Sequence, residues 1–126
     1  MADHKFGLHK AKEADFVKEG LRAFFSYRDL GIKEATNGDF AAHVIRAEEL
    51  IDKPGGKHTH QLEFQMVYML KGWAKFWYED KGECVLEVGD CVYQRPGIVH
   101  ELRDFSADCE MLEIVSPAKF GTQAAD

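Results

Sequence analysis

The sequence predicts one all-β domain, an antiparallel sandwich or barrel, and three observations lead to this fold class. The chain has 126 residues, a length at which a single hydrophobic core is expected. Turn-forming groups of Gly, Pro, Asn and Asp recur at short intervals, and short segments rich in Val, Ile, Phe, Tyr and Trp lie between them. Only residues 10–20 carry the pattern of a helical turn.

Nine strands are expected, each bounded by turn residues such as those around Gly38, Gly55, Gly82, Gly89 and Gly97. Their expected ranges are 21–29, 40–47, 57–61, 64–71, 73–79, 84–88, 91–95, 99–103 and 109–115. These strands place the β-domain at 21–116, between an N-terminal extension at 1–20 and a C-terminal tail at 117–126.

The strand expected at 64–71 is apolar at nearly every position, which is unusual for a strand with one face in water. Alternation from Gln65 predicts that Val67 and Met69 face the interior and that Tyr68 faces away. The second face then needs cover from the N-terminal strand or from another subunit, so we expect a homodimer.

Composition excludes several classes of partner. The formal net charge is −6 and is spread along the chain, so nucleic acid is not an expected partner. No stretch approaches the roughly 18 apolar residues of a membrane span, and the polar start is unlike a signal peptide. The expectation is a cytoplasmic protein that does not contact membranes.

Three histidines carry the chemistry that the sequence offers. His58 and His60 stand two residues apart in an expected strand, so their imidazoles share one face. Gln65 opens the next strand and offers an amide oxygen, and His100 follows a tight Pro96-Gly97 turn. Neutral imidazole is the commonest protein ligand for first-row transition metals, so these residues form a candidate metal site.

The two stretches that carry these residues resemble the two sequence motifs of the cupin superfamily. The first motif is G, five residues, H-x-H, three or four residues, E, six residues, G. Here His58-Thr59-His60, four residues, Gln65, six residues and Gly72 fit it except for the opening glycine. The second motif is G, five residues, P-x-G, two residues, H, and the stretch from Gly89 to His100 fits it with arginine at the first proline.

The resemblance implies a jelly-roll β-barrel holding one divalent metal ion, Mn, Fe, Co, Ni, Cu or Zn, on His58, His60, His100 and the residue at the glutamate position. That residue is Gln65, although Glu63 could compete for the metal if the intervening turn is short. Three imidazoles and an amide carry no charge, so the ion would keep its positive charge in a low-dielectric interior. We therefore expect an anionic small-molecule substrate or ligand.

Other residues have both functional and structural interpretations. Arg95 has two interpretations. It is either a surface residue paired with Asp90 or Glu101, or its guanidinium binds a carboxylate or phosphate group of a ligand with two hydrogen bonds. Tyr93 and Glu101 are conceivable catalytic helpers beside Arg95. Five aromatic residues could either line a ligand pocket or pack the core: Tyr68, Trp73, Phe76, Trp77 and Tyr93. Three histidines match no motif and are interpreted as structural or exposed: His4, His9 and His43.

Three classes of function remain open. The first is a metal-dependent enzyme of the dioxygenase, isomerase or decarboxylase type that acts on a small organic anion. The second is a non-catalytic module that binds or senses a small molecule or a metal. The third is an inert barrel that acts through its oligomer interface. The fold does not decide among them, because one scaffold hosts many chemistries.

Overall fold

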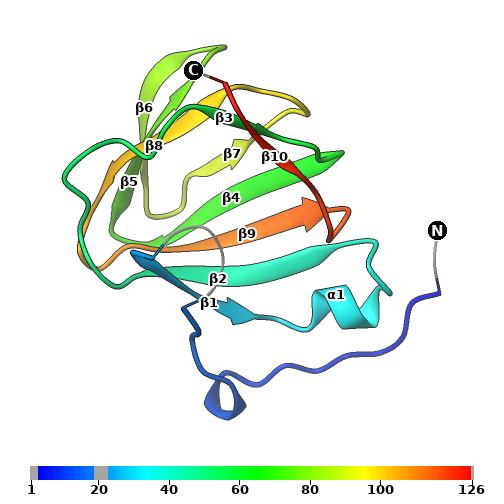
Figure 1. The fold of residues 1–126 in the computed structure, drawn as a ribbon. Helices are drawn as coiled ribbons and strands as arrows, with labels where there is room; N and C mark the ends of the chain where they lie inside the picture. Colours follow the sequence, from blue (N-terminus) through cyan, green and yellow to red (C-terminus); the bar gives the residue numbers. More distant parts are fainter. Residues whose placement is uncertain (1–2, 19–22, 126) are drawn as a thin grey trace.

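The computed structural model describes residues 3–18 and 23–125 and shows two antiparallel sheets that face each other (Figure 1). The predicted all-β jelly-roll class is therefore confirmed. The two sheets stay separate, so the barrel is a sandwich of two five-stranded layers.

The first sheet has the strand order β1-β2-β9-β4-β7. Its strands are β1 (Phe25–Asp29), β2 (Ala41–Ala47), β9 (Glu110–Ser116), β4 (Phe64–Lys71) and β7 (Cys91–Tyr93). β2 and β4 both pair with β9, so the middle of this sheet is formed by strands far apart in the sequence.

The second sheet has the order β10-β3-β8-β5-β6. Its strands are β10 (Thr122–Ala124), β3 (His58–His60), β8 (His100–Phe105), β5 (Trp73–Tyr78) and β6 (Gly82–Glu87). The helical elements of the described residues are a 3₁₀ turn, η1 (Ala11–Glu13), within the expected helical turn, and a short helix, α1 (Ile32–Ala35). The sequence analysis did not predict α1.

The core lies between the two sheets and follows the predicted alternation on β4. Val67 and Met69 are buried beside Gln65, whereas Tyr68 points outward with 38% of its surface exposed. Leu70 on the same outer face is also 38% exposed, so within one chain only the inner face of β4 is covered. Of the two covers expected for the outer face, the N-terminal segment does not provide it, because Val17 of this segment pairs with Tyr27 of β1. Cover by another subunit remains a prediction.

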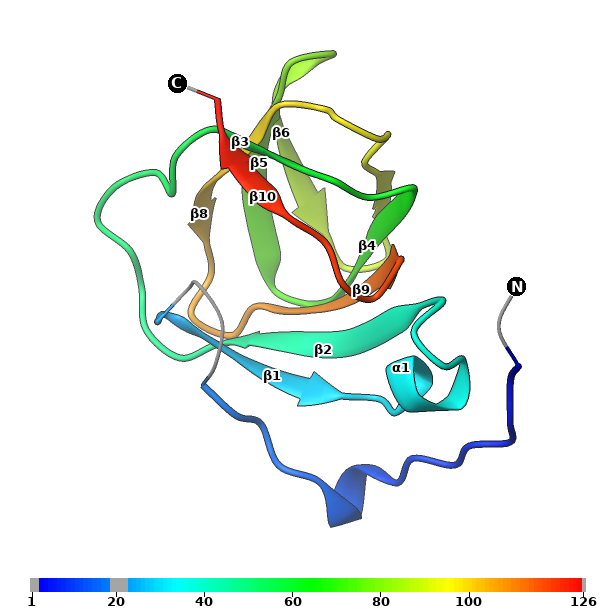
Figure 2. The same ribbon diagram turned by 45° about the vertical axis from the view of Figure 1, so that its right-hand side comes forward.

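Two ends of the chain pack differently from each other. The N-terminal segment runs along the β1 side of the molecule, where Val17 forms a bridge with Tyr27 (Figures 1 and 2). At the other end, within the expected tail, β10 crosses from the sheet that contains β9 to pair with β3 in the opposite sheet. Parts of the expected first strand and helical turn, at residues 19–22, lie outside the described residues.

Gly72 shows why one motif position needs glycine. It stands in the turn between β4 and β5 with a φ of 67°, in the left-handed region that favours glycine. A Cβ at this position would also collide with Ser106 Oγ and Asp108 Oδ1.

In the part of the chain that the structure describes, no helix has the length and apolar character needed to cross a membrane.

Candidate metal centre

A cavity of about 360 Å³ opens between the two sheets, a size suited to a small molecule. Both sheets supply its walls, and the lining combines apolar residues with polar residues that gather around the three histidines. The lining residues are Phe25, Tyr27, Asp29, His43, Ile45, His58, His60, Gln65, Val67, Phe76, Gln94, His100, Leu102, Met111, Glu113, Phe120 and Thr122.

The three predicted histidines meet in this cavity. One potential ligand nitrogen from each of His58, His60 and His100 lies within 4.8 Å of the others. The ring centroids are 4.3 Å apart for His58 and His100, 4.7 Å for His58 and His60, and 4.9 Å for His60 and His100. The pairing of β3 with β8 places His58 opposite His100, and the two-residue spacing puts His60 on the same face.

Hydrogen bonds at the far side of each ring orient the cluster. His58 Nδ1 donates to Gly56 O at 2.9 Å, and His100 Nδ1 donates to Ile98 O at 3.0 Å. A carbonyl oxygen only accepts, so the neutral rings carry their proton on Nδ1 and their lone pair on Nε2, the atom that would bind a metal. His60 Nδ1 instead bonds Thr122 Oγ1, at 2.8 Å.

Gln65 also lines the cavity, and its side chain is buried, whereas Glu63 is exposed. Gln65 Nε2 donates to Glu113 Oε2 at 2.9 Å. This bond fixes the amide orientation, so Oε1 is the atom of Gln65 that remains suited to a metal. Of the two alternatives for the fourth ligand, the burial therefore favours Gln65.

The sequence analysis missed a pair of titratable residues beside Gln65. His43 Nε2 lies 2.8 Å from Glu113 Oε1, and both side chains line the cavity. Burial raises the pKa of Glu113, but the hydrogen bond and charge of His43 and the bond from Gln65 outweigh it and leave that pKa below its usual value. The sequence analysis interprets His43 as structural or exposed; the structure places it in the cavity lining, in contact with Glu113.

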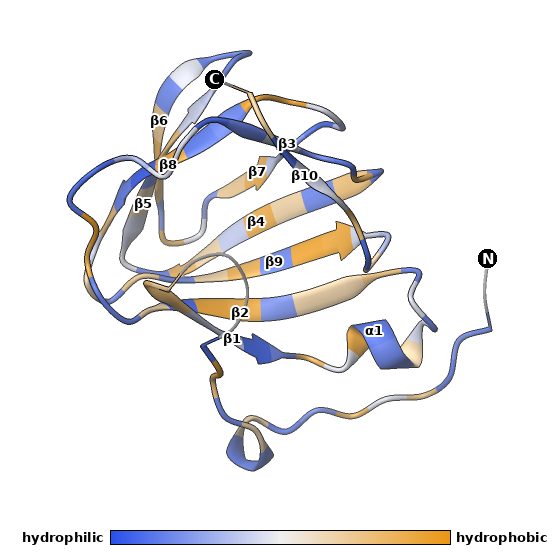
Figure 3. Ribbon diagram, in the orientation of Figure 1, coloured by the Kyte–Doolittle hydropathy of each residue, from blue (hydrophilic) through white to orange (hydrophobic). Residues whose placement is uncertain are grey.

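The signal for this pair was a charged residue in the centre of an apolar strand. His43 interrupts Ala41–Ala47 and Glu113 interrupts Glu110–Ser116, and the register of β2 with β9 sets the two directly opposite. Figure 3 shows hydrophilic bands within the apolar strands β2 and β9. The pairing of these distant strands could not be found from the sequence alone.

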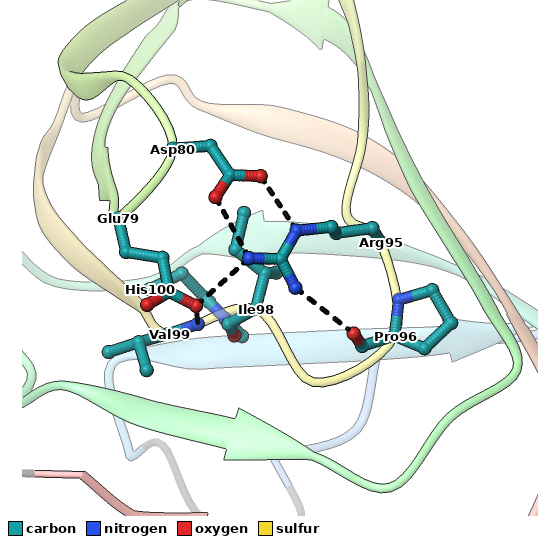
Figure 4. A network of polar contacts seen from close by, with 7 residues as sticks. All are labelled: Glu79, Asp80, Arg95, Pro96, Ile98, Val99 and His100. Carbon is teal, nitrogen blue, oxygen red and sulfur yellow. Dashed lines mark hydrogen bonds and ion pairs between the residues drawn. The ribbon is translucent and has the colours of Figure 1, made fainter.

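Arg95 does not reach the cavity. Its guanidinium donates to Asp80 through Nε at 2.7 Å and Nη2 at 2.8 Å, and to Glu79 Oε1 at 3.1 Å (Figure 4). Glu79 Oε1 also accepts from Val99 N at 3.0 Å, next to His100. The structural interpretation of Arg95 is the one observed, but its partners are not the Asp90 and Glu101 that we expected. We call the interactions of Arg95 with Glu79 and Asp80 the arginine clamp.

The other two expected helpers also lie outside the cavity lining. Tyr93 is 53% exposed, on the outer side of the edge strand β7. Glu101 is buried, and its carboxylate accepts from Gly56 N at 3.1 Å and from Arg103 Nε at 2.9 Å. Glu101 thereby anchors the turn that precedes His58. Of the five aromatic residues considered, Phe76 lines the cavity.

The donor set fits a divalent transition metal. Three imidazole nitrogens and an amide oxygen are ligands that first-row ions accept, and the imidazoles are held in place by bonds at Nδ1. Gln94 places a hydrogen-bond donor beside His100. Its Nε2 lies 3.5 Å from His100 Nε2, while its Oε1 accepts from Tyr78 Oη at 2.7 Å. Among the described lining residues there is no lysine or arginine.

Comparison with known structures supports the fold. KdgF from Halomonas sp. is similar with a TM-score of 0.72 and 17% identity, over 90% of this chain and 96% of that one. The polyketide cyclase RemF from Streptomyces resistomycificus has a TM-score of 0.76 and 12% identity, with coverages of 96% and 86%. A sugar phosphate isomerase of the cupin superfamily from Silicibacter pomeroyi has a TM-score of 0.75 and 14% identity, with coverages of 95% and 82%.

The sequence itself gives the family. No curated protein sequence matches the chain. The family model for the cupin domain matches residues 50–115, which is more than half of the chain and includes all three clustered histidines. Its region begins before the turn at Gly56 and ends within β9. The chain therefore belongs to the cupin domain family.

Proposed function

We propose that this chain is a metal-dependent enzyme that acts on a small organic anion. One divalent transition metal ion would be held by His58, His60 and His100, with Gln65 as the fourth ligand. The observation that carries the proposal is the convergence of three imidazoles, each bonded at Nδ1, at the polar end of a cavity of about 360 Å³.

The charges in the cavity support an anionic ligand that binds at the metal itself. The four protein ligands are neutral, so a divalent ion brings two positive charges to this end. Glu113 supplies one nearby negative charge, and its carboxylate is bonded to His43 at 2.8 Å. Because the described lining has no lysine or arginine, the cavity has no second site for a phosphate or another strongly charged group. A carboxylate or enolate oxygen suits it best.

The His43–Glu113 pair favours a reaction that moves a proton. A bound metal ion would act as a Lewis acid on the substrate oxygen. His43, oriented by Glu113, would take a proton from the carbon adjacent to the carbonyl carbon to give an enolate, and would return the proton to another carbon of that enolate, with no net oxidation. Isomerisation, or decarboxylation followed by protonation, fits these residues better than oxygen insertion. Two structural neighbours are named as a sugar phosphate isomerase and a polyketide cyclase.

The test is a substrate panel in deuterated water. Metal-loaded protein is mixed with small keto acids, hydroxy acids and diketones, and NMR follows deuterium uptake at carbon while an electrode follows oxygen. We expect deuterium uptake without oxygen consumption, reduced about 10²-fold or more in His43→Asn and Glu113→Gln. The matched control is His4→Asn, a half-exposed histidine that also bonds a carboxylate, Asp39, but does not line the cavity.

Two outcomes would contradict the proposed reaction. Oxygen consumption coupled to product formation, unaffected by the His43 and Glu113 substitutions, would indicate a dioxygenase. Thermal stabilisation by a compound that is never converted would indicate a binding or sensing module.

A further inference from the structure

The three imidazoles of the candidate metal centre are not oriented in the same way. His58 and His100 bond carbonyls only two residues away, Gly56 O and Ile98 O. His60 bonds Thr122 Oγ1, which is 62 residues distant in the sequence. Its ring also meets the Phe120 ring edge to face, with centroids 5.4 Å apart. Thus two contacts that orient the His60 ring, with Thr122 and with Phe120, come from residues 117–125, which we call the C-terminal segment.

The same segment holds the strand that carries two of the ligands. β3 pairs with β8 at one register position, His58 with His100. It pairs with β10 at three positions, from His58 opposite Ala124 to His60 opposite Thr122. Two further backbone bonds extend this pairing, Gln61 N to Gly121 O at 2.8 Å and Ala125 N to Lys57 O at 3.0 Å. Most of the pairing that keeps β3 extended therefore comes from the C-terminal segment.

The segment lies at the edge of its sheet. β10 is the outermost strand of its sheet, and its three residues are exposed. In Figures 1 and 2 it runs from the end of β9 to β3 and bridges the two sheets. Phe120 and Thr122 line the cavity, so the segment is also part of its wall. A short exposed edge strand of this kind is at the low end of local stability.

From these contacts we propose that the C-terminal segment is a positioning element of the metal centre, whose docking and metal binding stabilise each other. Thr122 is the positioning residue, because its hydroxyl fixes the ring orientation of His60. Coupling of this kind is reciprocal: if docking of β10 strengthens metal binding, metal binding strengthens docking of β10 by the same factor. This inference rests on the proposed metal centre and adds a role for the end of the chain.

The experiment compares three point variants with the full-length chain. Thr122→Val has nearly the same shape but loses the hydroxyl, Thr122→Ser keeps it, and Gln123→Val alters the exposed neighbour that does not line the cavity. The affinity for Mn²⁺ or Ni²⁺ is measured by titration of the metal-free proteins. We expect Kd to rise about 10- to 100-fold in Thr122→Val, and to stay within about twofold in the other two variants.

Amide hydrogen exchange measured by NMR gives the reciprocal effect. In the wild type, metal addition should slow exchange at Ala125 N and Gln61 N, the donors that join β3 to the C-terminal segment. In Thr122→Val this slowing should be smaller by the same factor as the loss of affinity. Equal metal affinity in Thr122→Val and wild type, with exchange at Ala125 unchanged by metal, would overturn the inference while leaving the metal centre intact.

A wild type that takes up no metal would overturn the proposed function instead. The metal-free proteins then still decide the positioning role. Faster exchange at Gln61 N in Thr122→Val than in Thr122→Ser would support it, and equal exchange in the two variants would overturn it.

Discussion

Gln65 is the residue that sets the charge of the candidate metal centre. Cupin motifs usually have glutamate at this position, but here Glu113 already supplies a carboxylate 2.9 Å from the Gln65 amide nitrogen. The sequence predicted His58, His60, Gln65 and His100 because they occupy the ligand positions of two short motifs that resemble those of the cupins. It could not predict His43 and Glu113, since these face the cavity only after β2 and β4 pair with β9 on either side.

A Gln65→Glu variant tests this arrangement. It replaces an amide donor by a second carboxylate beside Glu113, so the metal-free protein should lose about 1–3 kcal/mol of unfolding free energy. Added metal should then stabilise the variant more than the wild type, because the divalent ion neutralises the new charge. Chemical denaturation with and without metal measures both effects.

Glu63→Gln is the matched control for this variant, because Glu63 is the exposed alternative ligand. It should leave both stabilities unchanged. A loss of metal-dependent stabilisation in Glu63→Gln, with none in the Gln65 variant, would assign the fourth ligand position to Glu63.

At the scale of elements, the strands were predictable and their partners were not. Turn residues bounded nine strands correctly to within a few residues, except that the start of the first predicted strand lies partly outside the described residues. β10 was missed because three polar and small residues carry no alternation, and only the edge of β3 makes them a strand. The arginine clamp was likewise hidden, because Arg95 and Asp80 are adjacent only through the fold.

The arginine clamp gives a prediction about the turn that carries His100. Arg95→Lys keeps the positive charge but loses the planar guanidinium that donates to Asp80 and Glu79 at the same time, so the turn should become more mobile. Metal affinity should fall several-fold, whereas the unfolding midpoint should change little because the pair is exposed. Titration with metal and amide exchange at Val99 N measure the two effects.

The control for the clamp is Arg46→Lys, which changes another partly exposed arginine that bonds a carboxylate, Glu48, and does not line the cavity. The pKa of Asp80 lies below its ordinary value because of its bond with Arg95, so the clamp should hold at neutral pH and weaken only as the pH falls through that lowered pKa. An affinity in Arg95→Lys equal to that of the wild type would remove any role for the clamp in the metal centre.

At the scale of the whole molecule, the outer face of the first sheet exposes large hydrophobic side chains on two neighbouring strands. Tyr68 and Leu70 of β4 are each 38% exposed, and Tyr93 of the neighbouring edge strand β7 is 53% exposed. Apolar residues gathered on two adjacent strands are typical of a surface that contacts another protein. Homodimer formation, which we expected from the composition of β4, remains a prediction and is placed on this face.

Light scattering after gel filtration tests the homodimer. The wild type should show twice the chain mass of 14.3 kDa, and Tyr68→Lys should shift it to the mass of one chain. Val85→Lys, on the other sheet and 47% exposed, should leave the dimer intact. A single-chain mass for the wild type at all concentrations would contradict the prediction.

The most direct test of the central claim is the metal content of the purified protein. Wild type and His58→Ala/His60→Ala are prepared without added nickel or affinity-column metal, reconstituted with Mn²⁺ or Fe²⁺, dialysed and measured by elemental analysis, with circular dichroism to confirm folding. The account predicts one transition metal ion per chain in the wild type and none in the folded double variant. No bound metal in either protein after reconstitution would contradict it.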